Sequence, residues 1–430
     1  MRPFFIHQSE FQSWTRFGSK YNLYLYRERG YLDTLNGSDR HASSVQSRRR
    51  VPVLFVPGHC GSHRQVRSIA STVTQMHAEL ISDGSGDSLV DFDFFAIALN
   101  EEFTALHGHS LLEQAEYVNE AIRYILSLYD DDDVSSGGDN TTTTTATTTT
   151  DSRRPRSVMV IGHSMGGMVA RTAFMLPKHL DGSVDTIITL STPHNFPPVA
   201  LEQHIYDMYH EVNAFWRHGM ALNNSHRAPD LRDIALVSVV GGNLDGMINS
   251  DFAYIGHVVP EPINGMTVFT TGIPDVWLSA NHHSILWCRQ LVRRLSRAII
   301  ELGYLGKTDV KHRMQVFRRY FGSGFEVEAA LGSPVAAIPG QRAKSSVRAI
   351  DLDKTGPIIR SRHAAKRYLA VSGHDFAKLG LDSALVLLDV DYDRYHRDSD
   401  KRCIQIMYDP EISGGISQDD HESPHHSQQQ

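Results

Sequence analysis

"VMVIGHSMGGMVAR", residues 158–171, is the stretch of this chain that decides the fold. Four apolar residues precede the motif Gly-His-Ser-Met-Gly at 162–166, and "MVARTAFML", residues 168–176, follows with helical character. A strand that turns sharply into a helix through G-x-S-x-G presents its serine at the apex, and small flanking residues let strand and helix approach closely. The pattern therefore predicts that Ser164 is an activated nucleophile. A glycine-rich packing turn without chemistry is the alternative.

Strand-like and helix-like segments alternate on both sides of this motif. Short apolar runs rich in β-formers predict further strands at 22–26, 51–58, 91–99, 184–194, 234–242 and 266–272. Apolar residues at helical spacing predict helices at 62–81, 110–129, 165–176 and 284–303. This alternation is typical of a mainly parallel sheet with helices on both faces. The sequence therefore predicts the α/β class.

The alternating pattern ends near residue 305 of a 430-residue chain, and composition divides the rest. An acidic and then Thr-rich run cannot bury apolar surface and predicts a disordered insertion. Weak periodicity predicts a linker, and alternating apolar residues further on predict a partial β-rich region. The expected organisation is an α/β domain at 1–305 with the insertion at about 130–155, a linker at 306–345, the β-rich region at 346–412 and a disordered tail at 413–430.

Composition narrows the class of protein. Lys and Arg number 42 against 49 Asp and Glu, so the formal net charge is -7, which argues against a nucleic-acid partner. Three cysteines do not make a disulfide framework. No stretch reaches the roughly 20 consecutive apolar residues of a membrane span, and the first residues lack the apolar core of a secretory signal. On these observations alone the chain is expected to be soluble and untargeted.

A serine hydroxyl needs a positioned base, which in turn needs an acid to orient it. In hydrolases built on this motif the order along the chain is Ser, Asp, His. Asp245 follows a predicted strand two units after the motif and is the expected acid, with Asp251 and Asp275 as alternatives. His282 and His283 both lie before the final helix. Spacing alone leaves the choice between these two histidines open.

The oxyanion of an acyl-transfer intermediate needs two backbone N–H donors. Met165, the residue after the serine, is expected to supply one. The loop "VPGHCGS", residues 56–62, is expected to supply the other from His59, because its glycines allow close backbone approach. A plain turn is the alternative for this loop. His194, in "STPH", is expected near the rim of the site.

With these segments in hand, residues 21–303 resemble the GPI inositol-deacylase family of α/β-hydrolases. The strings P-G-x-x-G-S-x-x-Q-V-R-S-I-A-S and W-C-x-Q-L are far more specific than G-x-S-x-G. The matching segments are "YNLYLYRERG", "VPVLFVPGHCGSHRQVRSIAS", "DFFAIALNEEFTALHG", "LLEQAEYVNEAIRYILSLY", "VMVIGHSMGGMVAR", "IITLSTPHNFPP" and "VWLSANHHSILWCRQLV".

The resemblance implies an α/β-hydrolase fold and a serine esterase that removes the acyl chain from the inositol of glycosylphosphatidylinositol (GPI) anchors. It implies Ser164 as nucleophile and Asp245 as acid, and its D-H pattern before the final helix selects His282 as base. No metal or cofactor is implied. The implied partners are GPI lipid, GPI-anchored proteins and the endoplasmic reticulum membrane, with the catalytic domain in the lumen.

The chain departs from the family pattern at several points. His59-Cys60 stand where the family usually has Asn-Ala, and Asn281 replaces an Asp beside the base. The family carries an N-terminal membrane anchor and several C-terminal spans, neither of which is visible in this chain. Two further hypotheses stay open. A broader lipase or phospholipase would have the same motif and triad, and the changed loop and missing spans would suit a weakly catalytic hydrolase-fold protein that binds GPI-anchored cargo.

Overall fold

The structure is a computed structural model of the chain. It describes residues 2–29, 49–87, 89–129, 154–199, 201–221 and 230–323, together with four short strands further on. The chain divides into two compact units, Met1–Gly332 and Ser333–Gln430. The second unit holds an antiparallel sheet in the order β12-β11-β10-β9, with bounds Cys403–Met407, Val386–Val390, Lys366–Ala370 and Ile359–Arg360. Within the described residues, no helix combines the length and the apolar character needed to cross a bilayer.

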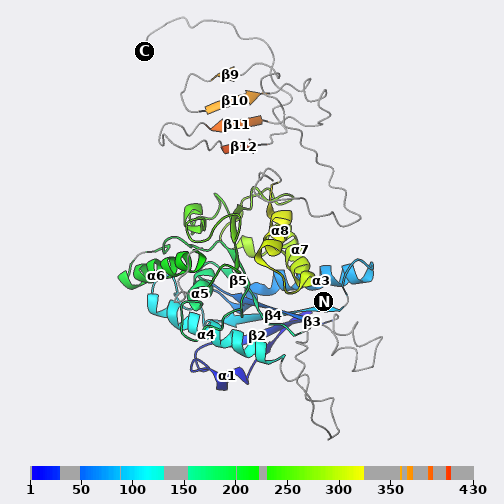
Figure 1. The fold of residues 1–430 in the computed structure, drawn as a ribbon, viewed down its shortest axis with the longest axis vertical. Helices are drawn as coiled ribbons and strands as arrows, with labels where there is room; N and C mark the ends of the chain where they lie inside the picture. Colours follow the sequence, from blue (N-terminus) through cyan, green and yellow to red (C-terminus); the bar gives the residue numbers. More distant parts are fainter. Residues whose placement is uncertain are drawn as a thin grey trace, which may run out of the picture. The chain divides into compact units, whose positions relative to one another are not determined.

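The first unit is built on an eight-stranded sheet in the order β1-β2-β4-β3-β5-β6-β7-β8 (Figure 1). The first two strands pair antiparallel, and β2 is also antiparallel to β4. All other neighbours are parallel. The strands are β1 (Arg2–His7), β2 (Asn22–Arg29), β3 (Arg49–Val56), β4 (Val90–Ala98), β5 (Met159–His163), β6 (Thr186–Leu190), β7 (Ala235–Val240) and β8 (Gly265–Phe269).

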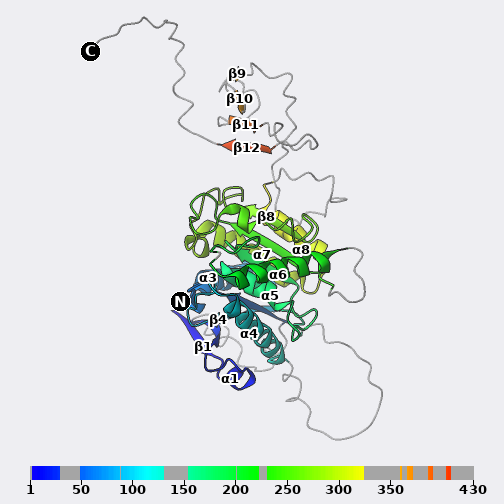
Figure 2. The ribbon, with the colours of Figure 1, turned by 90° about the vertical axis from the view of Figure 1, so that its left-hand side faces the viewer.

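Helices cover both faces of this sheet. One face packs against α4, α5 and α6, and the other against α3, α7 and α8 (Figures 1 and 2). Successive residues of β3 face opposite layers, since Leu54 and Val56 belong to the first core and Val53 and Phe55 to the second. The helices are α3 (Arg67–Ser82), α4 (Gly108–Ser127), α5 (Met165–Ala173), α6 (Gln203–Met220), α7 (Arg289–Leu305) and α8 (Val310–Phe321).

The predicted fold class is confirmed, because a mainly parallel sheet carries helices on both faces. Each predicted strand overlaps an observed one. The edge strand β1, the short helix α1 (Phe11–Trp14) and the helix α6 escaped the sequence patterns. In α6 the buried residues stand at helical spacing among many polar ones, which weakens the apolar pattern: Ile205, Met208, Tyr209, Val212 and Trp216.

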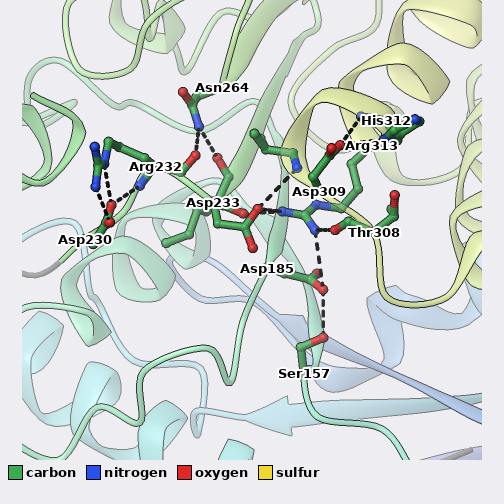
Figure 3. A network of polar contacts seen from close by, with 12 residues as sticks. Ser157, Asp185, Asp230, Arg232, Asp233, Asn264, Thr308, Asp309, His312 and Arg313 are labelled. Carbon is green, nitrogen blue, oxygen red and sulfur yellow. Dashed lines mark hydrogen bonds and ion pairs between the residues drawn. The ribbon is translucent and has the colours of Figure 1, made fainter. Parts of the chain in front are cut away.

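The segment expected to be a linker, 306–345, begins instead with the packed helix α8. Its buried Arg313 donates to the carbonyl oxygens of Thr308 and Asp233 and pairs with the Asp233 carboxylate at 3.1 Å (Figure 3). Asp185, 4.0 Å from the guanidinium, also accepts from Ser157 Oγ at 2.8 Å. This network fastens α8 to the amino-terminal edge of the sheet.

The rest of the expected domain organisation stays a prediction. The remainder of the predicted linker lies outside the described residues, and so do almost all of the insertion at about 130–155 and the tail at 413–430.

Candidate active site

Ser164 lies between β5 and α5, at the carboxyl edge of the sheet. Its φ of 53° and ψ of −127° belong to a region that residues with a side chain rarely adopt. The Ser164 N–H donates to the carbonyl oxygen of Leu190, at the end of the neighbouring β6, at 2.9 Å. Backbone strain of this kind persists only where the surroundings hold it, and it is concentrated at functional sites.

Glycines allow this turn to form. A Cβ atom on Gly162 would lie 2.6 Å from the Cα atom of Gly167 in the following helix. One on Gly166 would lie 2.1 Å from the carbonyl oxygen of Val56, in β3. Any side chain at these positions would therefore push helix and strand apart, which is the close approach expected for the motif.

Asp245 and His282 form a buried pair. His282 Nδ1 lies 3.2 Å from Asp245 Oδ2, and the two side chains are 5% and 1% exposed. Asp245 Oδ1 also accepts from the N–H groups of Met247 at 3.1 Å and Ile248 at 3.0 Å. Burial alone would raise the pKa of Asp245, but the hydrogen bonds from His282 and from the Ile248 N–H bring it below its usual value. The carboxylate is therefore ionised at neutral pH and can hold an imidazole in one orientation.

His163 brings the backbone of His282 to the residue next to Ser164. His163 Nε2 donates to the carbonyl oxygen of His282 at 2.8 Å, and the ring centroids are 4.9 Å apart. Burial and the neighbouring His282 lower the pKa of His163 to about 3, so its ring is neutral. The sequence analysis did not predict this contact. The one feature that could have indicated it is the histidine at the variable position before the serine.

The remaining candidates have other surroundings. The His283 side chain is exposed. Asp275 pairs with Arg294. Asp251 is exposed in the 3₁₀ helix η4 (Ser250–Ala253), where its carbonyl oxygen accepts from Asn195 Nδ2 at 2.7 Å. Of the candidate acids and bases, the structure thus brings Asp245 and His282 together.

Asn281 shapes the turn that carries His282. Its Oδ1 atom accepts from the N–H groups of His283 at 3.1 Å and Ser284 at 2.7 Å. Its own N–H donates to Ser284 Oγ at 2.9 Å. A carboxylate oxygen would accept the same two bonds, so Asn in place of Asp preserves this turn.

The segments that carry the two expected oxyanion donors also pack together. A Cβ atom on Gly58 would lie 2.5 Å from Ser164 Cβ and 3.1 Å from the Met165 nitrogen, so the loop after β3 packs directly on the turn. Met165 is the first residue of α5, and its N–H therefore has no acceptor within the helix. The side chain of the adjacent His59 points to the loop after β4, where its Nδ1 accepts from the Ala105 N–H at 3.1 Å.

Ser191 is a site residue that the sequence analysis missed. It is fully buried at the end of β6, with φ of 48°. Its N–H donates to the carbonyl oxygen of Val239 in β7 at 2.9 Å, while the preceding Leu190 accepts from Ser164. The hydroxyl lies beside Asp245 and contributes to lowering the pKa of that carboxyl. Nothing in its residue type or spacing signals this position.

His194, expected at the rim, is instead fully buried. Its Nε2 contacts Thr189 Oγ1 at 2.9 Å, and its Nδ1 contacts Arg171 Nη1 at 3.3 Å. Arg171, whose pKa burial lowers to about 9, also donates to Asn213 Oδ1 at 2.8 Å. The expectation was wrong because α6, which carries Asn213, covers this loop. His194 therefore ties the β6 loop to α5 and α6.

No metal-ligating cluster lies among the described residues, since no three His, Cys, Asp or Glu side chains there are arranged to hold an ion.

Comparison with known proteins shows the family to which the chain belongs. Residues 48–302 match a family model described as a PGAP1-like alpha/beta domain. The chain is 39% identical over 330 residues to the GPI inositol-deacylase of Debaryomyces hansenii, covering 73% of this chain and 30% of that protein. It is 41% identical over 342 residues to the GPI inositol-deacylase of Chaetomium globosum, and this match covers 78% of this chain and 28% of that protein. A Pyrobaculum calidifontis esterase superposes with a TM-score of 0.37 at 11% identity, and the superposition covers 70% of this chain and 85% of the esterase. The chain thus spans about 30% of the length of these curated relatives.

Proposed function

Because the chain belongs to the PGAP1-like alpha/beta domain family, we propose that it is a serine hydrolase that removes the acyl chain from the inositol of GPI anchors. The observation that supports the chemistry is the buried Asp245–His282 pair, with the His282 carbonyl oxygen bonded to His163, the residue before the strained Ser164. Relatives named GPI inositol-deacylase support the substrate class. GPI lipid and GPI-anchored proteins as partners, and the endoplasmic reticulum membrane as the setting, belong to the same proposal.

The proposed cycle is acyl transfer followed by hydrolysis. Ser164 Oγ attacks the ester carbonyl carbon while His282 Nε2 accepts the hydroxyl proton. Asp245 accepts a hydrogen bond from Nδ1–H and stabilises the imidazolium. The N–H groups of Met165 and His59 hold the negative oxygen of the tetrahedral intermediate. Collapse breaks the bond to the inositol oxygen, which takes the proton from His282. Water then repeats the attack and releases the fatty acid.

The substrate class is tested by comparing two esters. We expect the purified chain to release fatty acid from inositol-acylated GPI with a kcat/KM more than about a hundredfold above that for a glyceride ester, because a site that hydrogen-bonds inositol hydroxyls leaves its polar groups unpaired with a glyceride. Mass spectrometry of both lipid products measures this ratio, and a fluorophosphonate probe reports labelling of Ser164. Equal turnover would favour the broader lipase, and folded but unlabelled protein would favour the cargo-binding hypothesis.

Ser191 is proposed as a positioning residue that acts through Asp245. We expect removal of its hydroxyl to raise the pKa of Asp245, because that hydroxyl contributes to the low pKa of the carboxyl. We expect Ser191→Gly, which suits the φ of 48°, to lower kcat about tenfold. The acidic limb of the pH–rate profile, which reports the Asp245–His282 pair as a unit, should move to higher pH.

The matched control for Ser191 is Ser296→Ala, which removes another fully buried hydroxyl, in α7. Its acidic limb should coincide with that of the parent chain. A uniform loss of rate at every pH in Ser191→Gly would contradict the positioning role and indicate a purely structural one.

A further inference from the structure

Large apolar side chains are exposed on the loops that follow β4, β6, β7 and β8. We name them the apolar rim, and their exposed fractions run from 49% to 78%: Phe103, Phe196, Leu201, Leu244, Trp277 and Trp287. The carboxyl ends of parallel strands lie at one edge of a sheet, and that edge also carries Ser164, Asp245 and His282. Large exposed apolar side chains gathered at one edge of a domain are a feature of interaction sites.

Several contacts attach the apolar rim to the candidate active site. The Phe103 ring meets the His59 ring edge-on, with centroids 5.3 Å apart. Leu244 immediately precedes Asp245. The loop of Trp277 is fastened where the Ala280 N–H donates to the carbonyl oxygen of Gly241 at 2.7 Å. The apolar rim is therefore held by the same loops that hold the catalytic candidates.

The charge of the four loops that carry the apolar rim is one-sided. The four loops, 99–107, 191–202, 241–253 and 270–288, contain neither lysine nor arginine. Apart from histidines, their charged residues are all acidic: Glu101, Glu102, Glu202, Asp245, Asp251 and Asp275. Nearby, Lys20 is neutralised by Glu102 and Glu113, each 2.7 Å from its Nζ, while Arg64 lies in the 3₁₀ helix η2 (His63–Val66) that follows the loop after β3.

The opposite edge of the sheet has the contrary character. A cavity of about 690 Å³ opens there, at the amino ends of β3, β5, β6 and β7. Its lining holds more cations than carboxylates, namely Arg49, Arg50, Arg154, Arg156, Lys307 and Arg313 against Asp181, Asp185, Asp230 and Asp233. An anionic membrane would attract this edge and repel the catalytic one, because basic clusters rather than acidic ones bind anionic lipid.

We propose that the apolar rim docks the catalytic edge on a bilayer of zwitterionic lipids, with Trp277 and Trp287 at the interface. This inference rests on the proposed function, in which the ester lies in a membrane lipid. Tryptophan favours the headgroup region, where its ring is buried and its N–H stays hydrated. Apolar insertion needs no anionic lipid, so the absence of lysine and arginine from these four loops suits a neutral surface. Docking in this orientation presents Ser164 to the headgroup layer, where the acylated inositol resides.

Flotation of the chain with phosphatidylcholine vesicles tests the proposal. We expect Trp277→Ser/Trp287→Ser, and independently Phe196→Ser/Leu201→Ser, to lower the partition coefficient more than about tenfold. The matched control is Leu89→Ser/Leu305→Ser, which removes two exposed leucines at the basic edge and should leave flotation unchanged. Adding phosphatidylserine should weaken binding of the parent chain, and salt should restore it, because the catalytic edge is acidic.

Hydrolysis of a water-soluble short-chain ester provides the second readout. Both rim variants should retain this activity while losing turnover of a vesicle-borne ester. Unchanged flotation of either rim variant, no flotation of the parent chain, or binding that phosphatidylserine strengthens would each overturn the proposal. Flotation that follows the expected pattern without fatty-acid release from acylated GPI would instead refute the proposed function and leave the docking surface standing.

Discussion

Replacing Ser164 with alanine is expected to lower fatty-acid release about 10⁶-fold, because no other group can form the acyl intermediate. The backbone of Ser164 has φ of 53°, which alanine tolerates no better than serine. The free energy of unfolding of Ser164→Ala should therefore match that of the parent chain. Single-turnover kinetics with inositol-acylated GPI and urea unfolding measure the two quantities.

Ser164→Gly is the matched variant for this experiment. Glycine adopts the left-handed region without a steric cost, so this variant should be as inactive as Ser164→Ala but more stable, by about 1 kcal/mol. Greater stability with loss of activity would show that strain at the turn is maintained for catalysis. Fatty-acid release by folded Ser164→Ala at the rate of the parent chain would contradict the assignment of Ser164 as the nucleophile.

The two adjacent histidines should differ sharply when each is replaced. His282→Ala is expected to lower kcat/KM at least about 10⁴-fold, since the hydroxyl of Ser164 then lacks a base. His283→Ala should change it less than about threefold, because its side chain is exposed and the acid Asp245 contacts His282. Steady-state kinetics on the same ester, with the pair of variants purified in parallel, measure the contrast.

The control for this pair is the double variant Ser164→Ala/His282→Ala. Groups that act as one unit are not additive, so its residual rate should equal that of Ser164→Ala alone. Comparable losses in His282→Ala and His283→Ala would mean that the Asp245–His282 pair in the structure is not the catalytic one.

Much of the fold could be predicted from local pattern. Apolar runs such as 51–58 and 158–163 alternate with helical stretches, and that alternation requires a parallel sheet with both faces covered. Elements with mixed polarity were missed, as α6 shows, because its apolar stripe becomes recognisable only against the surface that it covers. The prediction of a linker at 306–345 was wrong over α8 for a related reason. Arg313 attaches α8 to the domain through a carbonyl oxygen and a carboxylate of Asp233, which is distant in sequence.

By itself, the sequence determined the turn that carries Ser164, since glycine requirements are local and Gly162 and Gly166 can be read directly. It also restricted the acid and the base to short stretches after particular strands. Only the tertiary structure decided which of these side chains meet. Asp245 and His282 lie 37 residues apart and touch because neighbouring strands end at one edge of the sheet. Spacing along a chain does not determine distance in space, and the register of the strands does.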